Sequence, residues 1–350
     1  MKKTVLQIHS LLIIFIASSI FTTSCSNLKL SENRSNTCLE NQAALDIGSG
    51  SSKILVAQMD TCAGKIKKII WKDSKSLKIK ESLVENQIPE EMAVQLNMTI
   101  SKWKAKNKFL KIKIYKAVAT EVFRQAQNGQ AVISKLEIDQ QIKINIIDQK
   151  QESILGFWSA VTQSGFEPNS IMSWDIGGGS MQMTTLDSNG KFIFYNGKMA
   201  SVSFKNDFLR TTKCFNKPDC SPNPLGLNGA LSAIKIAEIF AKKDVPVIIK
   251  KEIKNKKVIG IGGVHSKSIL DQLLKFQSSE KNFNLNNLQS LIFNNAKLSD
   301  SDLGGEYAET QVTNIALVLG FMKKLEIPVV YPVGCDLTQG LLVSKDFQKN

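Results

Sequence analysis

The sequence predicts a mixed α/β protein with two domains of the same design and a cleft between them. A nearly identical strand–loop–strand signature occurs twice, at residues 44–51 and 173–180. Strands and helices then alternate after each copy, which is typical of two similar α/β units. The length of 350 residues suits about two domains, and a hydrophobic content of 43% permits ordinary globular cores.

Each signature is a short apolar strand that ends in Asp-Ile-Gly, with the aspartate at Asp46 or Asp175, and continues into glycines and serines. Glycine lets the turn adopt positive φ and lets a polyanion approach the backbone. Successive N–H groups in such a turn form an anion-binding concavity, and the aspartate supplies the hard oxygen that magnesium prefers. One such loop can be only a hairpin turn. A pair predicts two facing loops that clamp one phosphate chain.

Residues 1–24 have the pattern of an export signal, with Lys2 and Lys3 before an apolar run at 11–20 and small residues at 22–24. The apolar run is too short for a permanent membrane span. Cys25 follows directly, as in bacterial lipoproteins, and residues 25–40 would then be a tether. Plain signal cleavage is the alternative, since Thr22 stands where leucine is usual. The expected location is the periplasm or cell envelope.

The remaining cysteines suit an oxidising compartment. A hairpin centred on Gly50 pairs residues whose numbers sum to about 100, so Cys38 and Cys62 are expected to form a disulfide. Cys214 and Cys220 bracket a turn-rich loop that a second disulfide would close. A metal site is the alternative there, but the sequence has only two histidines, which argues against a zinc site.

The formal net charge of +14 favours acidic partners. The lysines are scattered and no nucleic-acid-binding motif is present, so nucleic acid is not an expected partner. A surface composition biased toward lysine explains the excess equally well.

Hydrophobic periodicity predicts the remaining elements and a domain boundary near residue 150. The two domains are expected at 41–150 and 151–350, with the C-terminal segment able to pack back on the first. A helix after residue 147 should bury Ile154, Leu155, Trp158 and Val161 on one face. Strands are expected at 112–119, 142–147, 192–195, 257–261 and 327–331, and helices at 120–126, 229–242, 266–276 and 311–324.

Six segments in a fixed order carry a family resemblance, at residues 46–51, 119–126, 146–152, 175–180, 200–204 and 259–263. Together they resemble the exopolyphosphatase/guanosine pentaphosphate phosphohydrolase (Ppx/GppA) phosphatase family of the actin-like ATPase superfamily. The likeness extends over about residues 43–343. It implies two ribonuclease-H-like (actin-like) domains around a phosphate-binding cleft, and an enzyme that hydrolyses phosphoanhydride bonds.

The resemblance also implies residue roles. Asp46 and Asp175 would hold Mg²⁺ or another divalent cation, Arg124 would pair with a phosphate, and Glu152 would orient or deprotonate the attacking water. For Glu152 the alternative is an ordinary position in the first turn of a helix, where the helix dipole alone favours an acidic residue. For Arg124 the alternative is a solvated helix residue. The phosphate-binding residues would be Ser49, Gly50, Ser51, Gly177, Gly178, Gly179, Ser180, Gly262 and Gly263.

Several positions depart from the family pattern, among them Gly50, where asparagine is usual, Gln182 and His265. Gln182 replaces a glutamate, which would reduce metal affinity or abolish turnover while leaving anion binding. The alternative is that hydrolysis is kept, because extracellular apyrases carry glutamine at the matching place and an amide oxygen can still orient a water. His265 is expected at a helix start, with a phosphate contact as the alternative. The first expected function is an exported exopolyphosphatase-like hydrolase acting on polyphosphate or nucleotide phosphates. The others are an apyrase-like nucleoside di- or triphosphatase and a catalytically weak polyphosphate-binding lipoprotein, held at the membrane if Cys25 is lipid-modified.

Overall fold

A computed structural model describes residues 38–212, 220–276 and 281–345 of the chain. Both β-sheets and their helices lie in the unit Glu40–Asn350, apart from the first residue of β1. Among the described residues, no helix is both long and apolar enough to cross a membrane.

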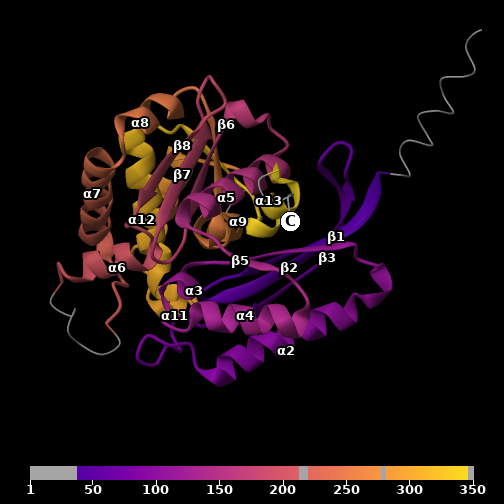
Figure 1. The fold of residues 1–350 in the computed structure, drawn as a ribbon. Helices are drawn as coiled ribbons and strands as arrows, with labels where there is room; N and C mark the ends of the chain where they lie inside the picture. Colours follow the sequence, from indigo (N-terminus) through magenta and orange to yellow (C-terminus); the bar gives the residue numbers. More distant parts are fainter. Residues whose placement is uncertain (1–37, 213–219, 277–280, 346–350) are drawn as a thin grey trace, which may run out of the picture. The chain divides into compact units, whose positions relative to one another are not determined.

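The first sheet has five strands in the order β3-β2-β1-β4-β5 (Figure 1). β1 pairs in parallel with β4, and β4 with β5, whereas β2 and β3 are antiparallel. Helices α2 and α4 pack together along this sheet, where Leu96, Ile100 and Ile133 are buried. The elements are β1 (Leu39–Ile47), β2 (Ser51–Asp60), β3 (Lys65–Ser76), α2 (Glu90–Lys106), η1 (Lys108–Leu110), β4 (Ile114–Ala119), α3 (Glu121–Gln125), α4 (Gly129–Gln140) and β5 (Ile144–Ile146).

The second sheet repeats this design. Its order is β10-β11-β9-β6-β7-β8, so β8-β7-β6-β9-β11 corresponds strand for strand to β3-β2-β1-β4-β5, and β10 adds an antiparallel edge. Its strands are β6 (Ile171–Ile176), β7 (Met181–Leu186), β8 (Phe192–Gly197), β9 (Lys257–Ile261), β10 (Phe283–Asn284) and β11 (Val329–Pro332). The mixed α/β class with two similar sheets is therefore confirmed.

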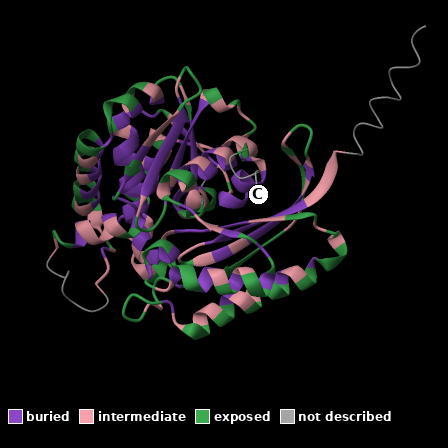
Figure 2. Ribbon diagram, viewed as in Figure 1, coloured by how far each residue is buried: buried purple, intermediate pink, exposed green. Residues whose placement is uncertain are grey.

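The helices of the second half enclose its core. α12 is buried along most of its length and packs against α7, where a Cβ at Gly320 would lie 2.5 Å from the Ala237 Cβ. Figure 2 shows buried residues concentrated on this sheet and the helices facing it. The elements are η2 (Pro168–Ser170), α6 (Ser201–Leu209), α7 (Gly226–Asp244), α8 (Val247–Ile253), η3 (Val264–Ile269), α9 (Leu270–Phe276), α10 (Leu285–Asn295), α11 (Asp300–Leu303) and α12 (Ala308–Leu325).

Two helices, each following the last parallel strand of one sheet, pack directly on one another. These are α5 (Gln149–Ser164) and α13 (Leu337–Val343). A capping box between Asp148 and Gln151 starts α5. α13 contacts β2, β3 and β4, so the C-terminal segment packs on the first sheet.

The predicted apolar face of α5 was partly wrong. Leu155 is buried against α13 and the first sheet, but Phe157 is also fully buried, against the second sheet. Trp158 and Val161 are only partly buried. The reason is that α5 packs against α13 and the first sheet on one side and against the second sheet on the other. Its buried residues therefore do not form a single apolar face.

Candidate active site

The two glycine signatures form equivalent turns, one between β1 and β2 and the other between β6 and β7. The Gly48 N–H donates to the Ser51 carbonyl at 3.1 Å, and the Gly177 N–H donates to the Ser180 carbonyl at 2.9 Å. A Cβ at Gly48 would lie 2.7 Å from that Ser51 oxygen, so the first turn requires glycine. No atom lies near the Cβ positions of Gly50, at the first loop, and Gly179, at the second.

A buried carboxylate precedes each turn. Asp46 is 4% exposed and Asp175 is half-buried. Burial raises the pKa of Asp46, opposed by the nearby Lys53. Burial likewise raises the pKa of Asp175 to about 6, with Lys53 opposing and the Asp46 charge adding to the shift. Because the two carboxylates act on one another and on the same lysine, both turns border one site.

Lys53 and Asp336 belong to this site although the sequence analysis did not identify them. The Lys53 Nζ lies 3.6 Å from Asp46 Oδ2. Burial disfavours its charged form, but Asp46, Asp336 and Asp175 together raise its pKa above the usual value. Asp336 caps α13, accepting from the Thr338 N–H at 3.0 Å. The available signal for Lys53 was a charge at the start of an otherwise apolar strand next to the first turn.

Glu152 and Arg124 meet at the same site. The Arg124 guanidinium lies 3.6 Å from Glu152 Oε2 and also donates to the Ile147 carbonyl. Burial raises the pKa of Glu152 to about 7, with further increases from Asp46 and Asp175 and an opposing effect of Arg124. Their side chains remain 30% and 25% exposed, so both are accessible to a ligand.

The hydroxyl groups of the two turns have local partners. Ser49 Oγ accepts from the Val122 N–H at 3.2 Å, which ties the first turn to α3, the helix that carries Arg124. Gln182 is buried opposite Asp175 in the β6–β7 ladder and donates to Ser180 Oγ at 2.9 Å. An amide thus lies directly beside the second carboxylate.

The third glycine segment also contacts Asp175. Gly262 has φ +84°, and a Cβ there would lie 2.4 Å from Asp175 Oδ1. Gly263 next to it is exposed, with open space at its Cβ position. The backbone here approaches the carboxylate more closely than any other residue type allows.

His265 does not face the site, so a phosphate contact by this residue is wrong. Its ring is fully buried in η3, with ring centroids 4.8 Å from Trp174 and 6.2 Å from Phe283. Burial lowers its pKa to about 3, so the imidazole is neutral. It behaves as an aromatic core residue.

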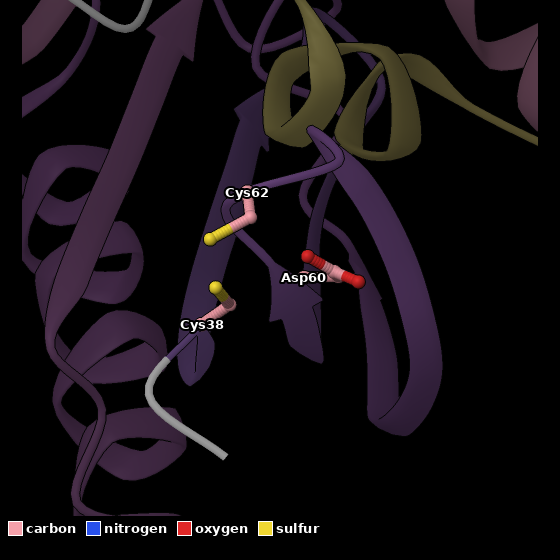
Figure 3. A group of neighbouring side chains, drawn as sticks. All are labelled: Cys38, Asp60 and Cys62. Carbon is pink, nitrogen blue, oxygen red and sulfur yellow. The ribbon is translucent and has the colours of Figure 1, made fainter. Parts of the chain in front are cut away.

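Cys38, Cys62 and Cys220 are disulfide-bonded. Figure 3 draws Cys38 and Cys62 with Asp60 as a group of neighbouring side chains. Sulfurs in disulfides offer no thiolate, so this group does not suit a zinc ion. Cys214 and Cys25 lie outside the described residues, as does the rest of the predicted leader and most of the predicted tether.

Comparisons with known proteins give one family match and several matches to solved structures. Residues 55–217 match the model of the Ppx/GppA phosphatase family. The crystal structure of the Aquifex aeolicus member of that family superposes with a TM-score of 0.70 at 18% identity, covering 89% of this chain and 99% of the other. A Cytophaga hutchinsonii exopolyphosphatase structure gives a TM-score of 0.65 at 14% identity, covering 87% and 96%. No curated protein matches at the sequence level. The structural similarities establish the fold.

Proposed function

We propose that this protein, in which residues 55–217 match the model of the Ppx/GppA phosphatase family, hydrolyses the terminal phosphoanhydride bond of an inorganic polyphosphate. The observation that carries this proposal is the position of Glu152. Its carboxylate lies beside Arg124, in the field of Asp46 and Asp175. Phosphoanhydride hydrolysis requires a group that orients or deprotonates water, a positive charge for the phosphate, and carboxylates that can bind a divalent cation.

Asp46 and Asp175 suit a divalent cation. Both are carboxylates whose pKa burial and nearby negative charge raise, which is the electrostatic condition that a bound cation relieves. Mg²⁺ binds through one or two carboxylates together with water and substrate phosphates. When bound, it would neutralise charge on the phosphate oxygens.

The chain's own residues supply the other requirements. Glu152, when ionised, takes a proton from the water that attacks the terminal phosphorus, and the bridging P–O bond breaks in line with that attack. Arg124 neutralises the phosphate oxygens with a planar fork of donors. The positive charge of Lys53 partly neutralises the negative charge of the buried carboxylates, which would otherwise repel an entering polyanion.

Phosphate release from long-chain polyphosphate, ATP and pyrophosphate, each with and without Mg²⁺, tests this function. Magnesium-dependent release that is fastest from polyphosphate supports the proposal. Faster release from ATP would favour an apyrase-like activity instead, which the amide of Gln182 beside Asp175 makes the second candidate. Release from none of the three would leave the binding-protein function.

We also propose that the protein acts outside the cytoplasm. Disulfide-bonded Cys38, Cys62 and Cys220 support this, because disulfides persist in oxidising compartments. Mass spectrometry of the mature protein should find a lipid-modified Cys25 at its N-terminus, and Cys25→Ser should release the protein from membranes. An unmodified N-terminus elsewhere in the chain would replace the lipoprotein proposal with plain signal cleavage.

The pKa of Glu152 predicts an acid limb in the pH–rate profile. A base works only when ionised, so kcat/KM should rise with pH and reach half its plateau near pH 7 instead of near 4.5. The same shift lowers folding stability as pH rises from 4.5 through about 7, because the native state holds a proton that the unfolded chain releases. Measuring kcat/KM from about pH 5 to 9 checks this, and a plateau already reached at about pH 5.5 would contradict it.

Arg124→Ala should weaken substrate binding and turnover together. Its guanidinium would contact a phosphate in both the ground state and the transition state, and loss of one charge-assisted contact corresponds to about a 10- to 100-fold effect. Arg210→Ala is the matched control, because Arg210 pairs with Asp207 on α6. An Arg124→Ala enzyme with unchanged kcat/KM would exclude the phosphate contact.

A further inference from the structure

A second pocket, distinct from the candidate active site, lies between the first sheet and α13. Its volume is about 260 Å³, and its lining includes Gln42 from β1, Lys116 from β4 and Leu342 from α13. Gln42 and Asp46 lie on the same strand, four residues apart, which corresponds to about 13 Å along a strand. The pocket is thus separated from the carboxylates of the catalytic cleft.

Gln42 lies in the wall of this pocket and positions the Glu40 carboxylate. Its side chain is 6% exposed, and its Oε1 has no hydrogen-bond partner. Its Nε2 donates to Glu40 Oε1, which fixes the amide orientation, since the carboxylate can only accept. The donation also holds the Glu40 carboxylate in a fixed position at the pocket.

Opposite charges line the same pocket without direct pairing. Lys116 Nζ donates to the Leu342 carbonyl at 3.0 Å, which leaves two of its three N–H groups for another acceptor. Glu40 and a second lysine, Lys143, also line the pocket, and Glu40 acts electrostatically on Lys116. In the described part of the chain, Glu40 and Lys116 form no ion pair with each other within 4.0 Å.

Partial burial of Lys116 strengthens its attraction for an anionic ligand group. Burial lowers the pKa of Lys116 to about 8, opposed by Glu40, so the ammonium is charged at neutral pH but poorly solvated. An anionic ligand group would replace the lost solvation. Met59 and Leu341 give the remaining wall an apolar character.

We propose that this pocket binds a small zwitterion with an apolar side chain, namely an aliphatic α-amino acid. Its carboxylate would contact Lys116, and its ammonium would contact Glu40. Its side chain would lie against Met59, Leu341 and Leu342. The volume is at the lower end for ligand pockets, as suits a molecule of this size. The proposal is independent of the polyphosphate activity.

Calorimetric titration of the full chain with L-leucine tests the pairing of charges. The matched probes are 4-methylpentanoate, which lacks the ammonium, and 3-methylbutylamine, which lacks the carboxylate. L-leucine should bind with a Kd of about 1 mM or lower, and each half-ligand at least about tenfold more weakly. No detectable leucine binding, or a half-ligand that binds as tightly, would overturn the proposal.

Substitutions locate the site. Lys116→Met keeps the side-chain stem but removes the charge, and Glu40→Gln removes the opposite charge, so each should weaken leucine binding about tenfold or more. Lys113→Met, an exposed position on the same segment, and Glu152→Gln should leave leucine binding unchanged. Wild-type affinity in a folded Glu40→Gln protein would reject the site even if Lys116→Met fails to fold.

Discussion

Glu152→Gln is expected to lower kcat by about 10²–10⁴-fold, the usual scale for loss of a general base, while polyphosphate binding persists. The substitution keeps the shape of the side chain and removes only the charge that accepts a proton. The proposed phosphate contacts lie elsewhere, in the two glycine turns and Arg124. Steady-state phosphate release together with equilibrium binding of polyphosphate measures both quantities on one protein.

Glu91→Gln is the control for this substitution, because Glu91 is exposed in the first turn of α2 and away from the site. It should leave kcat unchanged. If Glu152→Gln retains full turnover, Glu152 is not the base. If it loses binding to the same extent as turnover, its role is to hold Arg124 in place, since the two side chains lie 3.6 Å apart.

Gly340→Ala should destabilise the protein and lower turnover together. A Cβ at Gly340 would lie 1.9 Å from the Leu155 carbonyl oxygen and 2.9 Å from Ser159 Oγ. The Gly340 N–H also donates to Ser159 Oγ at 2.7 Å, so the helices have no room to accept the methyl group. Overpacking of this kind costs about 3 kcal/mol, which lowers Tm by roughly 5–10 °C. Because α5 carries Glu152, separation of the helices would also displace the proposed base.

Calorimetry and phosphate release on the same preparations check this prediction. Gly334→Ala is the matched control, since Gly334 precedes the same helix but has no atom within 4 Å of its Cβ position. Its Tm should stay within about 1–2 °C of the wild-type value. A Gly340→Ala protein as stable as this control would show that α5 and α13 can move apart at little cost.

Periodicity and turn chemistry predicted the parts of the fold that depend on short stretches of sequence. The two Asp-Ile-Gly turns, β9 and the core of α12 were anticipated because glycine turns and apolar alternation are local signals. Strand β3, with lysines at Lys65, Lys67 and Lys68, was not predicted. Its polar composition masks a strand that pairs along its whole length with β2.

The site was predictable where a motif marked it and not where tertiary packing created it. Asp46, Asp175, Arg124 and Glu152 followed from motifs, although their roles await the experiments above. Asp336 enters the site only because α13 packs against α5 and the first sheet. These contacts join segments far apart in the sequence, with Gly340 lying 181 residues from Ser159 and Leu342 lying 226 residues from Lys116. His265 lies at a helix start as expected, but the burial of its ring could not be predicted, because only packing places the ring in the core.

The repeated strand order gives the site an internal two-fold relationship that its side chains do not obey. Lys53 follows Asp46 by seven residues, and Gln182 follows Asp175 by seven, so the two occupy equivalent places in the duplicated hairpins. A cation in one half, an amide in the other, and Arg124 in the first half alone make the two halves of the proposed site chemically unequal. The two ends of a linear polyphosphate are identical, so this inequality distinguishes places in the protein and not directions of the chain. Whichever end enters, its terminal phosphate would meet the proposed base Glu152 only on the side that also carries Arg124.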